Sequence, residues 1–238
     1  MDRDLVKILG YGVDSFTFDE AVEYAYSHHG QIVTINPEMI SEARKNKDFS
    51  EIVEHADLVV PDGIGVEIGL KILGHKVRRI PGIELGRALI VKFSDENKTV
   101  AFVGAKHEVV ESAVKMLRTD IQNLNVVYFH DGYFKDANII MDSLYQAKPD
   151  LVLVALGSPK QEFFIAEMKT RLPNSTFIGL GGSFDVWAGH VERAPEIYQN
   201  LGLEWLYRTI KEPKRFKRIF PTLPLFILSV LKERLFRR

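Results

Sequence analysis

The chain has 238 residues, a formal net charge of −1 and no cysteine, which excludes disulfide bonds and thiolate catalysis. A chain of this length forms one large domain or two small ones and buries roughly 70–75% of its unfolded surface, so it needs no cross-links. Basic residues are concentrated in residues 211–238, which hold nine Lys or Arg and two Glu. A general nucleic-acid-binding protein spreads its basic charge over a wider surface, so we expect no nucleic-acid partner.

Short apolar runs rich in β-branched residues recur along the chain and predict strands. Each run is nearly continuous, as expected for parallel strands that are covered on both faces. The runs are Leu5–Leu9, Gln31–Ile35, Asp57–Val60, Thr99–Val103, Val126–Phe129, Leu151–Leu156 and Thr176–Leu180. The acidic segment Met1-Asp2-Arg3-Asp4 precedes the first run, and it is not a secretory signal because it lacks an apolar core.

Helical patterns separate these runs. The first opens on Thr17-Phe18-Asp19-Glu20, which is a capping box. The predicted helices are Thr17–Ser27, Pro37–Lys45, Ile64–Leu73, Ile83–Phe93, Glu108–Leu117, Ala137–Gln146 and Lys160–Arg171. Alternation of strand and helix predicts an α/β fold with a doubly wound, mainly parallel sheet over residues 1–192. Residues 193–238 change in composition and predict a basic, helical, amphipathic C-terminal appendage.

Small, polar or charged residues follow five successive strands. In parallel α/β sheets the ligand lies beyond the carboxyl ends of the strands, so these segments predict a ligand crevice. They are Thr34–Pro37, Pro61–Gly65, Gly104–Lys106, Asp131–Tyr133 and Gly157–Glu162. The candidate substrate-binding residues within them are Asn36, Gly104, Gly132, Tyr133 and Gly157.

Asp62 has two interpretations. It could begin an Asp-Gly turn or cap the following helix. It could also be a carboxylate placed at a strand end as a general base. Thr34 and Asn36 are similarly ambiguous, because either could cap the helix that starts near Pro37 or face a ligand.

The predicted helix that starts at Lys160 has features of an anion-binding site. Pro159 is tolerated in the first turn, where backbone amides lack intrahelical partners. Those amides and the Lys160 ammonium group attract a phosphate. Gln161 adds a polar side chain, and Gly181-Gly182 after the last strand allows a close backbone approach.

Two rival functions have weaker signals. Gly63–Gly69 follows a strand and opens a helix, yet it misses the dinucleotide pattern G-x-G-x-x-G by one residue. The histidines show no zinc-binding spacing, and Asp2-Arg3-Asp4 is the only D-x-D sequence. We therefore expect no metal and no cofactor, with Arg, Lys and helix amides stabilising a leaving diphosphate.

The C-terminal segment combines basic and apolar residues. Lys214–Arg218 precedes Ile219–Leu231, which is shorter than the ~20 apolar residues that cross a bilayer. A helix after Pro224 would put Leu225, Phe226, Leu228, Leu231 and Leu235 opposite a polar stripe, as in helices that lie in a membrane interface. The alternative is a helix that docks on its own domain or on a partner subunit.

Taken together, these motifs resemble the WecG/TagA/CpsF glycosyltransferase family, from about residue 5 to residue 218. They are Thr34-x-Asn36-Pro37, Pro61-Asp62-Gly63, Gly157-x-Pro159-Lys160-Gln161-Glu162, Gly181-Gly182-x-Phe184-Asp185, Ala188-Gly189, Arg193-Ala194-Pro195 and Glu204-Trp205-x-x-Arg208. The resemblance implies a Rossmann-like enzyme that works without a metal. It also implies a cytoplasmic protein that self-associates and binds peripherally to the inner face of the cell membrane. It implies a UDP-sugar donor and an acceptor of N-acetylglucosamine linked to undecaprenyl diphosphate.

The resemblance also implies roles for individual residues. Asp62 would be the general base, with Thr34 beside it. The residues that would bind UDP or the lipid diphosphate are Lys160, Gln161, Arg193, Glu204, Arg208, Arg215 and Arg218. The expected reaction is inverting transfer of N-acetylmannosamine, the first step of the wall teichoic acid linkage unit. Transfer of N-acetylmannosaminuronic acid or a hexose, an NAD-dependent oxidoreductase, and a non-enzymatic nucleotide binder are the alternatives.

Overall fold

The computed structural model describes residues 3–211 and 216–236, apart from the side chains of residues 200, 208 and 216–221. The strands are β1 (Leu5–Ile8), β2 (Tyr11–Asp14), β3 (Gly30–Ile35), β4 (Leu58–Pro61), β5 (Thr99–Gly104), β6 (Asn125–His130), β7 (Leu151–Ala155) and β8 (Thr176–Gly179). The longer helices are α1 (Phe18–His28), α4 (Ile64–Ile72), α5 (Gly82–Asp95), α6 (His107–Asp120), α7 (Ala137–Ala147), α8 (Lys160–Arg171) and α12 (Phe216–Phe236). The shorter helices are α2 (Pro37–Ala43), α3 (Lys47–Glu54), α9 (Ser183–Trp187), α10 (Glu196–Asn200) and α11 (Glu204–Lys211).

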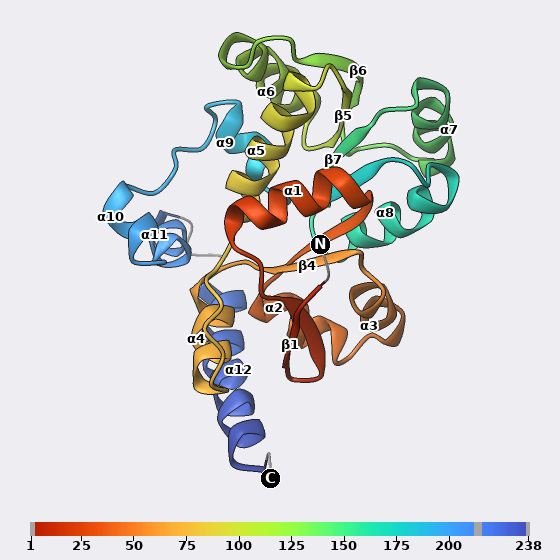
Figure 1. The fold of residues 1–238 in the computed structure, drawn as a ribbon. Helices are drawn as coiled ribbons and strands as arrows, with labels where there is room; N and C mark the ends of the chain where they lie inside the picture. The colour runs from red at the N-terminus through yellow and green to blue at the C-terminus, as the bar shows by residue number, and fades with distance from the viewer. Residues whose placement is uncertain (1–2, 212–215, 237–238) are drawn as a thin grey trace.

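A six-stranded parallel sheet with the order β4-β3-β8-β7-β5-β6 forms the centre of the fold. Alternate strand residues point to opposite faces. Phe102 and Ile178 belong to the core that α1, α5, α6 and α9 cover, whereas Val103 and Phe177 belong to the core that α7 and α8 cover. Helices therefore lie on both faces (Figure 1), and the predicted doubly wound α/β fold is confirmed.

The first predicted strand was placed wrongly. β1 pairs antiparallel with β2 in a separate hairpin and takes no part in the parallel sheet. Leu9 and Gly10 form its two-residue turn and both have positive φ, as type I′ hairpin turns require. Asp14 is buried, pairs with Arg3 and accepts a hydrogen bond of 2.8 Å from the Val59 amide, which fastens the hairpin to β4.

Local sequence signals account for several helix starts. Thr17 and Glu20 form the predicted capping box of α1. Asn36 caps α2, and its Oδ1 accepts hydrogen bonds of 3.0 Å from the amides of Glu38 and Met39. The capping interpretation of Asn36 is therefore confirmed.

The C-terminal helix differs from the prediction. α12 begins before both Pro221 and Pro224, and it docks on the α/β domain, which confirms the alternative that the sequence left open. The helix lies beside α4 (Figure 1). Phe226, predicted on an exposed apolar face, is buried with Val230 in the core formed with α2 and α4. Glu233 accepts a hydrogen bond of 2.7 Å from the Leu9 amide. Five other apolar residues of α12 are exposed: Leu225, Leu228, Leu231, Leu235 and Phe236.

Candidate active site

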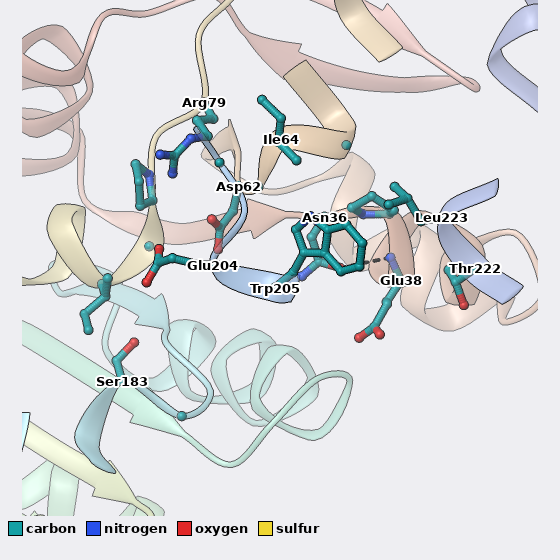
Figure 2. Close-up of a pocket in the computed structure, with 18 of the residues that line it drawn as sticks. Asn36, Glu38, Asp62, Ile64, Arg79, Ser183, Glu204, Trp205, Thr222 and Leu223 are labelled. Atoms are coloured by element: carbon teal, nitrogen blue, oxygen red, sulfur yellow. Dashed lines mark hydrogen bonds between the residues drawn. The ribbon is translucent and has the colours of Figure 1, made fainter. Parts of the chain in front are cut away.

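The catalytic cavity, as we call the hollow beyond the ends of β3, β4 and β8, has a volume of about 280 Å³. Its walls come from two parts of the chain that are far apart in sequence. The α/β domain contributes Asn36–Glu38, Asp62–Gly65, Arg79, Pro81–Ile83, Leu180, Gly182 and Ser183, and the C-terminal segment contributes Gly202, Glu204, Trp205, Thr222 and Leu223. Figure 2 shows that this segment closes one side of the cavity over Asp62.

Asp62 follows β4 directly and lines this cavity. The N-cap residue of α4 is Gly63, so the interpretation of Asp62 as the N-cap residue is wrong. The Asp62 amide donates a hydrogen bond of 2.8 Å to the Ile35 carbonyl, which ties the loop to the neighbouring strand. The carboxylate of Asp62 therefore lies at the cavity, and its predicted role as general base stays a prediction.

Thr34 and Asn36 lie on the β3 side of the catalytic cavity. Asn36 lines it, and because its oxygen caps α2, its amide nitrogen is the group left to donate to a ligand. Thr34 is 8% exposed and lies behind the cavity wall, since a Cβ at Gly82 would come within 3.2 Å of its methyl carbon. The predicted role of Thr34 beside the base stays a prediction.

Arg79 and Trp205 are among the residues of the catalytic cavity that sequence reasoning missed. Arg79 brings a guanidinium group to the same cavity as Asp62 and donates to the Gln199 carbonyl. Trp205 brings an indole ring whose Nε1 is shielded from solvent and has no hydrogen-bond partner. Glu204-Trp205 stood among the sequence motifs, so the signal for Trp205 was present, whereas Arg79 follows no strand end directly.

Arg193 lies in an ion-pair network. Its guanidinium group pairs with Glu84 at the start of α5, and its Nε lies 3.5 Å from Glu204 Oε1. These pairs connect the C-terminal segment to the α/β domain beside the catalytic cavity. Arg193 and Glu204 were predicted to bind substrate, and in this structure the two residues bind each other.

The nucleotide cavity, as we call a second hollow beyond the ends of β5, β6 and β7, has a volume of about 820 Å³. Gly132, Tyr133 and Lys160 line it, as the predicted crevice requires. Tyr133 is 74% exposed, so its ring is accessible to a ligand. Lys160 is the first residue of α8, and therefore its ammonium group and the first amides of that helix lie at the same end of the sheet.

The other predicted residues fall outside the two cavity walls or outside the described side chains. Gly104 packs against the Ala155 backbone and allows Gly132 to approach, and Gly157 lies in the loop before α8. Gln161 is buried between the two cavities. The side chains of Arg208 and Arg218 and the whole of Arg215 lie outside the described residues.

The glycines of α4 have a packing role. A Cβ at Gly65 would lie 2.8 Å from Leu223, and one at Gly69 would lie 3.2 Å from Phe226. These glycines therefore let α12 approach α4 closely. Two of the three glycines that weakly resembled a dinucleotide-binding loop therefore pack against protein, which weakens the support for an NAD-dependent oxidoreductase.

Comparison with known proteins decides the family. The Glycosyl transferase WecG/TagA/CpsF family matches residues 6–238. The chain belongs to this family. N-acetylglucosaminyldiphosphoundecaprenol N-acetyl-beta-D-mannosaminyltransferase of Bacillus spizizenii strain W23 is 38% identical over 203 residues, covering 85% of the chain and 79% of that enzyme. The enzyme of the same name from Bacillus subtilis strain 168 is 35% identical over 219 residues, covering 89% of the chain and 85% of that enzyme.

Membership of this family makes the protein a glycosyltransferase. Within the described residues, no helix is long and apolar enough to cross a membrane. No group of three or more His, Asp or Glu in the same part of the chain is arranged to hold a metal ion.

Proposed function

We propose that the protein transfers N-acetylmannosamine from UDP-N-acetylmannosamine to N-acetylglucosamine linked to undecaprenyl diphosphate, with inversion at the sugar carbon. The observation that supports this reaction most directly is the placement of Asp62 in the catalytic cavity. The names of the two Bacillus relatives support the choice of both substrates. The same reaction would begin the linkage unit of wall teichoic acid.

The proposed reaction needs one carboxylate. Asp62 takes the proton of the acceptor hydroxyl, and the resulting oxygen attacks the anomeric carbon of the donor. The bond between that carbon and the phosphate oxygen breaks, and UDP leaves with the bonding electrons. The oxygen attacks from the face opposite UDP, so inversion follows from a single displacement. Trp205 offers a flat apolar surface for a sugar ring at the same place.

We propose that protein cations stabilise the leaving diphosphate without a metal. Arg79 supplies positive charge in the catalytic cavity, and Lys160 with the first amides of α8 supplies it in the nucleotide cavity. Such groups stabilise developing negative charge where water is excluded. Addition of EDTA should therefore leave the turnover rate within about twofold of the untreated enzyme. A rate that EDTA abolishes and Mg²⁺ or Mn²⁺ restores would contradict this proposal.

A screen of donors tests the proposed function directly. UDP-N-acetylmannosamine, UDP-N-acetylglucosamine, UDP-N-acetylmannosaminuronic acid and UDP-glucose are supplied separately with a short-chain lipid-diphosphate N-acetylglucosamine acceptor. The disaccharide product is detected by mass spectrometry, and we expect it with UDP-N-acetylmannosamine. Product formed only from the uronic acid or from the hexose would replace the proposed donor. Absence of product with every donor would refute the proposed function.

We further propose that the enzyme binds the inner face of the cell membrane through α12. Its exposed leucines and Phe236 form an apolar strip beside the basic residues Lys232 and Arg234. Each Lys or Arg near an anionic surface contributes about 1 kcal/mol to binding. Co-sedimentation with phosphatidylglycerol vesicles measures this association. The predicted self-association stays a prediction, which light scattering of the purified protein would measure.

A further inference from the structure

Glu162 and Gln161 form a buried hydrogen-bonded pair between the two cavities. Glu162 is 2% exposed and Gln161 is 5% exposed, so both polar side chains are almost completely removed from water. They lie in the first turn of α8, next to Lys160 of the nucleotide cavity. On the other side, Gln161 reaches the loop that contains Gly182 and Ser183 of the catalytic cavity.

Backbone geometry determines the orientation of the Gln161 amide. The Gly181 N–H, which can only donate, lies 3.0 Å from Gln161 Oε1. The amide nitrogen therefore faces the opposite way and donates a hydrogen bond of 2.8 Å to Glu162 Oε1. Gly179 leaves the space that this amide occupies, because a Cβ at Gly179 would lie 2.5 Å from Gln161 Nε2.

The second oxygen of Glu162 indicates the charge state of this carboxyl group. Oε2 is shielded from solvent and has no hydrogen-bond partner. A buried carboxylate with one oxygen left unpaired is costly, whereas the neutral acid removes most of that cost. Burial accordingly raises the pKa of Glu162, and the opposing hydrogen bonds from Gln161 and Ser158 are smaller influences.

We propose that Glu162 is an uncharged positioning residue that holds Gln161, and that Gln161 in turn holds the Gly181–Ser183 rim of the catalytic cavity. The Glu162 backbone is itself anchored, since its carbonyl accepts a hydrogen bond of 3.2 Å from Gln31 Nε2 on β3. A rim fixed in this way keeps Gly182 and Ser183 at the wall that faces Asp62. The catalytic consequence rests on the proposed function, but the positioning itself does not.

Three variants at Glu162 test this inference in the full-length protein. Glu162→Gln keeps an uncharged acceptor for the Gln161 amide, so this variant should retain most of the wild-type kcat. Glu162→Leu removes the acceptor, and Glu162→Asp is too short to reach Gln161. Both should lower kcat by about 10- to 100-fold, the range expected when a buried hydrogen bond is lost. Because Asp retains the carboxyl group, this variant also serves if the Leu variant fails to fold.

A double-mutant cycle with Gln161→Met tests whether Glu162 affects kcat through Gln161. If Glu162 acts through Gln161, the double variant Gln161→Met with Glu162→Leu should be within about twofold of Gln161→Met alone. Thr176→Val is the matched control, because it removes a buried hydrogen bond of 3.1 Å at the other end of β8. This control should retain wild-type kcat.

Hydrogen exchange of the Gly181 amide measures how firmly the Gly181–Ser183 rim is held, and it needs no substrate. We expect Glu162→Leu and Glu162→Asp to speed exchange of the Gly181 N–H by about tenfold or more, and Glu162→Gln and Thr176→Val to leave it unchanged. Unchanged Gly181 exchange in both Leu and Asp variants would overturn the inference. The inference would also be overturned by a Glu162→Gln variant with a kcat as low as that of Glu162→Leu, or by an equal loss of kcat in Thr176→Val. Effects of Gln161→Met and Glu162→Leu on kcat that multiply in the double variant would overturn it as well. A wild-type enzyme inactive with every donor would refute the proposed function alone.

Discussion

Asp62→Asn should lower kcat by about 10²- to 10⁴-fold, which is the usual contribution of a general base. Asn has nearly the same shape as Asp but cannot accept the proton of the acceptor hydroxyl. The cavity wall should therefore persist, and the affinity for UDP should stay near the wild-type value. Single-turnover product formation and calorimetric titration with UDP measure the two quantities. A variant with wild-type kcat would remove Asp62 as the base.

The matched control for this prediction is a carboxylate at the other end of the same strand. Asp57 precedes β4, accepts a hydrogen bond of 2.7 Å from the Gln31 amide and pairs with Lys169. Asp57→Asn should lower the melting temperature and leave kcat per folded molecule unchanged. A comparable loss of kcat in this variant would show that Asp62→Asn reports stability instead of chemistry.

Phe226→Ala should weaken the docking of α12 and, with it, catalysis. Truncation of a buried phenylalanine costs about 3–5 kcal/mol. Phe226 is 5% exposed and contacts α4 at Gly69. Because Thr222 and Leu223 of the same helix line the catalytic cavity, loosening the helix opens that wall. We expect kcat/KM with a short-chain acceptor to fall by more than about tenfold.

Leu228→Ser on the same helix separates catalysis from membrane binding. Leu228 is 54% exposed, so the substitution leaves the docked face of α12 intact. This variant should bind phosphatidylglycerol vesicles less tightly and retain kcat/KM on the short-chain acceptor. Unchanged vesicle binding would contradict the proposed membrane surface, and a Phe226→Ala enzyme with full activity would contradict the proposed role of α12 in closing the site.

Much of the α/β domain could be predicted from local patterns. The apolar runs of β3 to β8 and the capping residues Thr17 and Asn36 act over a few residues, so sequence alone indicates their structure. The first apolar run was the exception. Its length and composition match a buried strand, and only its antiparallel pairing with β2 across the turn at Leu9 and Gly10 shows that it forms a hairpin.

The site could be predicted in part. Asp62, Asn36, Gly132, Tyr133 and Lys160 were expected because residues at the carboxyl ends of parallel strands meet at one edge of a sheet. Arg79 was missed because no strand end precedes it directly. The pairing of Arg193 with Glu84 was also missed, since opposite charges far apart in a sequence carry no signal that they meet.

The sequence by itself determined the order of strands and helices, the family motifs and the position of the expected base. Only the tertiary structure decided that α12 docks through Phe226 and Val230 while Leu225, Leu228, Leu231 and Leu235 stay exposed. It also decided that Trp205 and Leu223 complete the wall over Asp62. The physical reason is that helical periodicity shows which residues share a face, whereas the partner of that face depends on packing between distant segments. Here the close approach at Gly65 and Gly69 of α4 makes that packing possible.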